Sequence, residues 1–179
     1  RRTELARNPQ QHAAELRYSS RLSTFNYRGT HRYSWTLCTS HRRRVFTGAA
    51  TVSTIRTQFL QASQTGQIAI LAYCFMPDHV HLLLEGSTTG SSATRFISRA
   101  KQASGYWYAQ RTGQRLWQRS SWDRVLRRED DTWTVIKYIL STPVRAGIVE
   151  RPLDYPFSGS MVYERVRLLE AFMVGSSTS

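Results

Sequence analysis

The segment of residues 68–85 constrains the fold more than any other part of the sequence. It starts with an apolar run that is too short for an independent helix and reaches Pro77-Asp78, a pair that favours a turn. After the turn, His79 and His81 alternate with aliphatic residues. Because alternate side chains of a strand point to opposite faces, this pattern predicts a β-hairpin with two histidines on one face of its second strand.

The two histidines are candidate metal ligands. Neutral imidazole is the commonest protein ligand for a divalent ion, and two imidazoles leave positions for a third protein group and for substrate oxygens. The alternative is a pair of solvated or hydrogen-bonded histidines on an amphipathic strand. The apolar hairpin around His79 and His81, together with the motifs described below, favours the metal site.

The charge of the chain favours a polyanionic partner. The formal net charge is +13, and Lys101 and Lys137 are the only lysines among the 25 basic residues. Guanidinium groups bind phosphate through paired hydrogen bonds and stack on bases, so an excess of arginine indicates nucleic acid. A genome biased toward arginine codons explains the arginines but not the shortage of carboxylates. A membrane surface or an acidic protein would also fit the charge.

The chain of 179 residues is long enough for one domain with its own core. We expect a basic arm over residues 1–28, the main domain over 29–174 and a disordered tail over 175–179. Cys38 and Cys74 lie in apolar segments, so we expect both to be buried and reduced. Without an apolar run of about 20 residues or a signal sequence, the chain is expected to be cytoplasmic and not bound to a membrane.

Hydrophobic periodicity indicates the remaining elements. Besides the hairpin, strands are predicted near residues 33–38 and 116–118, and residues 122–127 are expected to lead into the next helix. Helices are predicted over 51–64, 93–110, from Asp131 onward and over 163–173. This order predicts an α+β sandwich in which helices cover one face of an antiparallel sheet. The histidine pair would then open onto the uncovered face.

Several arginines are candidate contacts for DNA phosphates. They lie in the basic loop after the first strand, on one stripe of the second helix, and in two later segments. The candidates are Arg42, Arg43, Arg44, Arg95, Arg99, Arg124 and Arg145.

Tyr138 lies on the polar side of the helix that begins at Asp131. After it, Thr142 is the expected N-cap of a new helical turn and Pro143 its first residue, so Tyr138 precedes a break in the helix. It also lies near a basic residue, Arg145. A tyrosine in such a position is most often a packing residue with a solvated hydroxyl, and these neighbours favour a functional one instead.

Together these motifs resemble the single-tyrosine HUH transposases, and within them the REP-associated tyrosine transposases. The resemblance is carried by four motifs that occur in this order: MPDHVHLLL (76–84), LWQ (116–118), YILSTPVRAGIV (138–149) and YPFS (155–158).

The resemblance implies that residues 29–174 are a catalytic domain with an RRM-like or ferredoxin-like fold. It implies a bound Mg²⁺ or Mn²⁺ and a monomeric or homodimeric enzyme that nicks and joins single-stranded DNA beside a hairpin formed by a REP-like palindrome. His79 and His81 match the metal-binding pair, and Tyr138 matches the nucleophile that becomes joined to a 5′-phosphate. The family usually has Asn, a third metal ligand, where this chain has Thr142. A hydroxyl is a poorer ligand than an amide carbonyl, so a weak metal site is expected.

Two other functions are compatible with the residues. A non-catalytic protein that binds single-stranded nucleic acid or hairpins would combine the arginines with four aromatic stacking platforms, Tyr33, Trp35, Trp107 and Trp117. A metal-dependent hydrolase would use the histidines to activate water. A protein–DNA adduct that survives denaturation would indicate the transposase. Binding without an adduct would indicate the non-catalytic binding protein, and a free 5′-phosphate would indicate the hydrolase.

Overall fold

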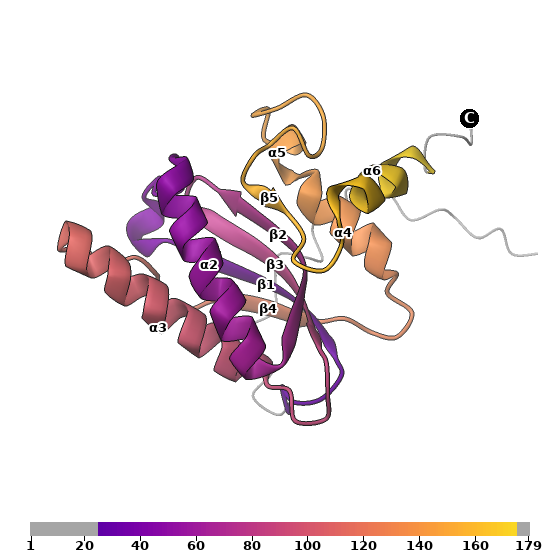
Figure 1. Cartoon of the computed structure of the whole chain (residues 1–179), viewed down its shortest axis with the longest axis horizontal. Coiled ribbons are helices and arrows are strands. Elements are labelled where there is room, and N and C mark those ends of the chain that lie inside the picture. Colours follow the sequence, from indigo (N-terminus) through magenta and orange to yellow (C-terminus); the bar gives the residue numbers. More distant parts are fainter. Residues whose placement is uncertain (1–24, 175–179) are drawn as a thin grey trace, which may run out of the picture.

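A computed structural model describes residues 25–174, which form a five-stranded antiparallel sheet flanked by helices (Figure 1). The strands lie in the order β4-β1-β3-β2-β5. In chain order the elements are β1 (Arg32–Cys38), the 3-10 helix η1 (Ser40–Arg42), α2 (Ala49–Gly66), β2 (Ile68–Met76), β3 (His79–Gly86), α3 (Ala93–Thr112), β4 (Trp122–Val125), α4 (Thr132–Leu140), α5 (Thr142–Arg145), β5 (Ser158–Gly159) and α6 (Arg165–Met173). The predicted α+β class with an antiparallel sheet is confirmed.

The predicted histidine hairpin forms the centre of this sheet. β2 and β3 pair from the turn at Met76 and His79 down to their far ends. On its other edge β3 pairs with β1, where Cys38 lies opposite His79 and Thr36 lies opposite His81. A strand paired on both sides has its backbone fixed along its length, so the two histidines occupy a rigid part of the fold.

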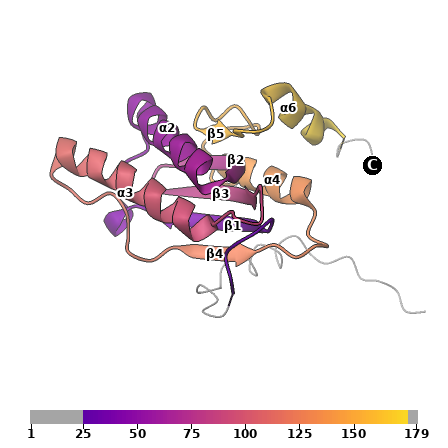
Figure 2. The same cartoon turned by 60° about the horizontal axis from the view of Figure 1, so that its bottom comes forward.

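α2 and α3 lie side by side over one face of the sheet (Figures 1 and 2). The aliphatic residues that alternate with the histidines point to this face and are buried. Large aromatic side chains fill the space between the layers; they include Tyr33, Trp35, Phe46, Phe59, Phe75 and Phe96. Because full burial of one large apolar side chain stabilises a protein by about 1.5–3 kcal/mol, this layer is the main hydrophobic core.

The second face of the sheet is partly covered, contrary to the sequence prediction. α4 (right in Figure 1) packs on β2 and β3 there, and α6 contributes one buried residue. The second hydrophobic cluster includes Cys74, Leu83, Ile136, Ile139, Leu140 and Leu168. The physical reason lies in β2, which is apolar at every position, as in strands that are buried on both faces. The helices therefore leave only a part of this face for a functional site, over β1, β4 and the end of β3 that carries the histidines.

The predicted basic arm and disordered tail lie outside the described residues, apart from residues 25–28. In that segment the expectation was wrong, because Tyr27 is buried in the core and its hydroxyl donates a hydrogen bond to Asp123 (2.5 Å). Cys38 and Cys74 are buried and not disulfide-bonded, as expected. Within residues 25–174, no helix has the length and apolar character needed to cross a membrane.

Asp131 caps α4, the helix that carries Tyr138. Its carboxylate accepts hydrogen bonds from the hydroxyl and the backbone N–H of Thr134, both at 2.7 Å, and these bonds lower its pKa. We expect Asp131→Ala to lower the free energy of unfolding by about 1 kcal/mol. Because the carboxyl pKa is lower in the folded state, this stabilisation is present at neutral pH and is lost as the pH falls through the lowered pKa.

Urea denaturation of the parent and of Asp131→Ala, at neutral and at acid pH, checks this prediction. The difference between the two proteins should shrink at acid pH. A difference that is equal at both pH values would contradict a charged cap.

Candidate functional site

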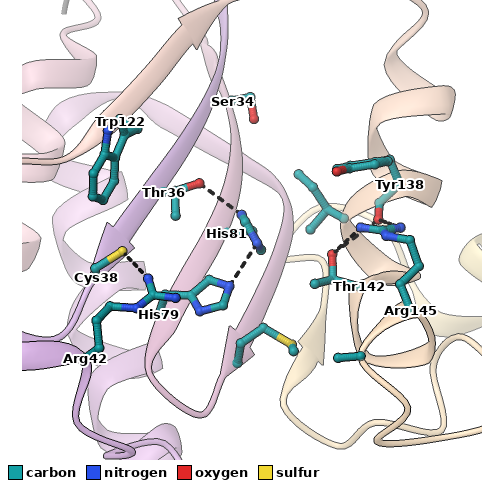
Figure 3. Close-up of a pocket in the computed structure, with 13 residues that line it drawn as sticks. Ser34, Thr36, Cys38, Arg42, His79, His81, Trp122, Tyr138, Thr142 and Arg145 are labelled. Carbon is teal, nitrogen blue, oxygen red and sulfur yellow. Dashed lines mark hydrogen bonds between the residues drawn. The ribbon is translucent and has the colours of Figure 1, made fainter. Parts of the chain in front are cut away.

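A cavity of about 640 Å³ lies where β1, β3 and β4 meet α4 and α5 (Figure 3). Its lining contains Ser34, Thr36, Cys38, Arg42, Met76, His79, His81, Trp122, Tyr138, Ile139, Thr142, Arg145 and Ala146. The fold thus brings together the histidine pair, the tyrosine and the threonine that the sequence singled out, together with two of the predicted arginines.

His79 and His81 face each other with their Nε2 atoms 3.1 Å apart. The Nδ1 atom of each ring has its own partner, Asp78 Oδ1 at 2.6 Å for His79 and Thr36 Oγ1 at 3.0 Å for His81. Such partners orient a metal-binding imidazole and leave its Nε2 lone pair available. Burial lowers the pKa of His79 and lowers that of His81 to about 3. Both rings are therefore neutral at pH 7, the state that binds metal ions.

This pair fits two positions of a divalent metal ion. Two metal–nitrogen bonds of about 2.1 Å at a right angle separate the nitrogens by about 3.0 Å, which agrees with the observed Nε2 distance. Within the part of the chain that the structure describes, no third His, Cys, Asp or Glu joins the pair to form a three-residue site. The remaining positions would be open to oxygen ligands.

Thr142 is the first residue of α5 and not its N-cap, which is Ser141. The predicted cap was wrong by one residue, because Ser141 is both the C-cap of α4 and the N-cap of α5. The Thr142 hydroxyl donates to the carbonyl oxygen of Tyr138 (3.4 Å) and accepts a hydrogen bond from Arg145 Nη2 (2.9 Å). Neither partner is a metal ligand, so the place of Thr142 as the third ligand stays a prediction.

Tyr138 extends from the end of α4 into the cavity, with its hydroxyl on the side of the histidines (Figure 3). The guanidinium of Arg145 stacks on its ring, with Cζ 3.9 Å from the ring centroid. Arg145 Nη1 also donates to the carbonyl oxygen of Tyr138 at 2.8 Å. The short helix α5 reverses the chain, so that Arg145, seven residues after Tyr138, reaches the Tyr138 ring. One side chain thereby holds both the ring and the backbone of Tyr138.

On the side of the cavity away from Tyr138, Arg42 contacts Asp78 and Cys38. The sequence did not predict these contacts. The Nε atom of Arg42 forms an ion pair with Asp78 Oδ2 (2.9 Å), and its Nη1 lies 2.7 Å from Cys38 Sγ. Since Asp78 also binds His79, one carboxylate links the cation to the imidazole. His41 and Arg42 have φ values of 56° and 55°, a left-handed turn for which the sequence carries no glycine or asparagine signal.

The other predicted DNA contacts are spread over the molecule. Arg124 lies in β4 and forms an ion pair with Asp130 (3.1 Å). Arg95 and Arg99 project from α3, on the side of the sheet opposite the histidines, and line two separate hollows. The fold does not bring Arg95 or Arg99 to the cavity, and their contacts with DNA stay a prediction.

The aromatic residues expected to stack on bases are not available for stacking. Tyr33, Trp35 and Trp117 are at most 4% exposed, and Trp107 is partly buried against the same core. That expectation was wrong because these side chains point into the layer between the sheet and α2 and α3. Besides Tyr138, the cavity lining contains one tryptophan, Trp122. The orientation of Trp122 depends on the pairing of β4 with β1 and could not be known from sequence.

Arg43 and Arg44 are expected to act differently. Arg43 binds the carbonyl oxygens of Ser40 and Arg115, whereas Arg44 is exposed and makes no hydrogen bond or ion pair within residues 25–174. We expect Arg44→Gln to lower the salt slope of log affinity for single-stranded DNA by about 0.7 without changing the melting temperature. Arg43→Gln should instead lower the melting temperature.

Fluorescence anisotropy over a salt series, with calorimetry on the same samples, measures both quantities. An unchanged salt slope in Arg44→Gln would exclude Arg44 as a phosphate contact.

Comparisons with known proteins identify the family to which the chain is similar. A model of the family described as "Transposase IS200 like" matches residues 28–139, which include the histidine pair and Tyr138. A Haemophilus influenzae protein described as a REP-associated tyrosine transposase is 25% identical over 118 residues, covering 60% of this chain and 67% of that protein. A solved structure of a REP-associated tyrosine transposase bound to a REP hairpin matches with a TM-score of 0.64 at 20% identity, covering 78% of this chain and 82% of that chain. At that identity the structural match bears on the fold alone.

Proposed function

This chain belongs to the IS200-like transposase family, and we propose that it cuts and rejoins single-stranded DNA beside a hairpin through a covalent bond to Tyr138. The observation that carries the proposal is the convergence of Tyr138 with His79 and His81 on one cavity. Two of the proteins that match this chain are described as REP-associated tyrosine transposases, and one of these two is bound to a REP hairpin. This supports hairpin DNA as the partner.

The side chains that line the cavity would have three different roles in the reaction. His79 and His81 would hold Mg²⁺ or Mn²⁺, and such an ion supplies positive charge to the scissile phosphate. Arg42 and Arg145 add fixed positive charge from two sides of the cavity, where charge develops as the phosphodiester bond breaks. Tyr138 supplies the nucleophile, and a phenol hydroxyl is a weak nucleophile until the negative charge on its oxygen is stabilised.

The covalent step exchanges one phosphodiester bond for another. The Tyr138 oxygen bonds to phosphorus, the bond from phosphorus to the 3′ oxygen breaks, and that oxygen takes up a proton as the phenol loses one. The tyrosine ester preserves the energy of the original bond. The 3′-hydroxyl of a second strand can therefore attack the same phosphorus, restore the phenol and join DNA without ATP.

Incubation of the protein with hairpin oligonucleotides from its own genomic neighbourhood, in the presence of Mn²⁺, tests this proposal. We expect a protein–DNA product that survives heating in detergent and a released strand with a free 3′-hydroxyl. Binding without this product would support the non-catalytic binder instead. A free 5′-phosphate without the product would support the hydrolase.

Thr142→Asn tests whether position 142 supplies the third metal ligand. An amide carbonyl is a better ligand for these cations than a hydroxyl that is already bonded to Arg145 and to the Tyr138 carbonyl. We expect the variant to lower the metal concentration for half-maximal adduct formation without changing DNA affinity in chelator. The parent should need more Mg²⁺ than Mn²⁺, since nitrogen ligands favour Mn²⁺.

Thr142→Val, which keeps the shape of the side chain without its hydroxyl, is the matched control. If Thr142→Asn is no better than the parent with either ion, the third ligand lies elsewhere.

A further inference from the structure

Trp122 is a large aromatic side chain left exposed beside the proposed catalytic cavity. It is 44% exposed and lines the same cavity as the histidine pair. Among the described residues, the only other aromatic side chain with comparable exposure is Tyr106, on the outer surface of α3, away from this cavity. Covering an exposed indole ring with a flat apolar surface is favourable, so Trp122 is suited to receive a ligand with an aromatic face.

The sheet places Trp122 in line with the histidine site. In β4 it pairs with Thr36 of β1, and Thr36 pairs with His81 of β3, so the three residues form one row across the sheet. Neighbouring strands lie about 4.8 Å apart, which puts Trp122 about 10 Å from His81 along this row. One nucleotide can span such a separation from its base to its phosphate.

Tyr138 lies on the other side of the histidines from Trp122 (Figure 3). In an in-line displacement at phosphorus, the attacking and leaving oxygens lie on opposite sides of the phosphorus. With the scissile phosphate at the histidines and Tyr138 attacking from α4, the leaving 3′ oxygen points toward β4. The nucleotide that carries this oxygen then lies against Trp122.

We propose that Trp122 stacks on the base of the nucleotide immediately 5′ of the scissile phosphate, the nucleotide that leaves with the free 3′-hydroxyl. The proposal rests on the proposed function and adds a base-binding subsite to it. Stacking on the indole holds the released 3′ end in the cavity, where it can attack the tyrosine ester again. Because every base has a flat aromatic face, stacking on Trp122 fixes the position of the nucleotide and discriminates little between bases.

Abasic scanning of a hairpin oligonucleotide with a short single-stranded flank tests this subsite. The abasic position is moved one nucleotide at a time along the flank, and affinity is measured in a Tyr138→Phe background that prevents cleavage. Trp122→Ala should weaken binding by about 5- to 100-fold. Trp122→Phe should recover part of that affinity, and Tyr106→Ala, the matched control, should bind as the parent does.

At one flank position the abasic site should cost the parent as much affinity as Trp122→Ala, and the two changes together should cost no more than either alone. In a protein with Tyr138 intact, this position should be the nucleotide 5′ of the phosphate that becomes joined to tyrosine. Additive losses at every position, or an equal loss in Tyr106→Ala, would overturn the subsite. Thermal melting of each variant separates lost stacking from lost folding.

The outcomes also separate the subsite from the proposed function. A covalent adduct that forms at the parental rate in Trp122→Ala, measured at DNA concentrations below saturation, would overturn the subsite and leave the nicking function intact. A single abasic-sensitive position that depends on Trp122, without any adduct in the parent, would support stacking and overturn the nicking function.

Discussion

Tyr138→Phe is expected to abolish every covalent product with DNA and to leave the affinity for hairpin DNA unchanged. The change removes one oxygen atom and keeps the aromatic ring on which Arg145 stacks. Loss of a nucleophile lowers a rate by about 10⁴-fold or more, because no other group takes over the covalent step. Denaturing electrophoresis of the adduct and anisotropy of the bound hairpin measure the two quantities on the same preparation.

Tyr106→Phe is the matched control for this variant, since it removes a phenolic oxygen from an exposed tyrosine on α3. It should form adduct at the parental rate. An adduct that persists in Tyr138→Phe would assign the nucleophile to another residue.

Replacing either histidine by Ala is expected to abolish Mn²⁺ binding and to lower the rate of adduct formation by about 10²- to 10³-fold. The two Nε2 atoms lie 3.1 Å apart, and either variant leaves one nitrogen, which cannot hold the ion alone. DNA affinity in chelator should not change, because the arginines carry it. Calorimetric titration with Mn²⁺ and single-turnover adduct rates of His79→Ala and His81→Ala measure these effects.

His31→Ala is the matched control, because His31 is exposed and lies outside the cavity lining. It should bind Mn²⁺ as the parent does. Unchanged Mn²⁺ binding in both His79→Ala and His81→Ala would contradict a metal site at this pair.

The hairpin and the helix that carries Tyr138 could be predicted because their signals are local. Alternation around His79 and His81 fixes which side chains share a face, and the cap at Asp131 marks where α4 begins. β4 (Trp122–Val125) and β5 (Ser158–Gly159) were missed because strands of four and two residues are too short to show a period. The strand expected at 116–118 is only an isolated bridge between Trp117 and Thr39. The packing of α4 on the second face of the sheet was also missed, although the continuous apolar run of β2 is typical of a strand buried on both faces.

The contacts that complete the site depend on tertiary structure. Arg145 was recognised as a neighbour of Tyr138, but its stacking on the ring requires the turn made by α5. The link from Arg42 to Asp78 requires left-handed backbone at His41 and Arg42, neither of which is a glycine. Trp122 reaches the cavity only through the register of β4 on β1, which joins segments far apart in the sequence.

The central claim, that Tyr138 carries the cut DNA strand, is tested most directly by locating the DNA on the protein. Trypsin cuts after Lys137 and Arg145, which releases residues 138–145 as a peptide with Tyr138 as its only tyrosine. After nuclease digestion of the purified adduct, fragment-ion mass spectrometry should find the nucleotide phosphate on Tyr138 of this peptide. A nucleotide on Ser141, on Thr142 or on any other peptide would contradict the account.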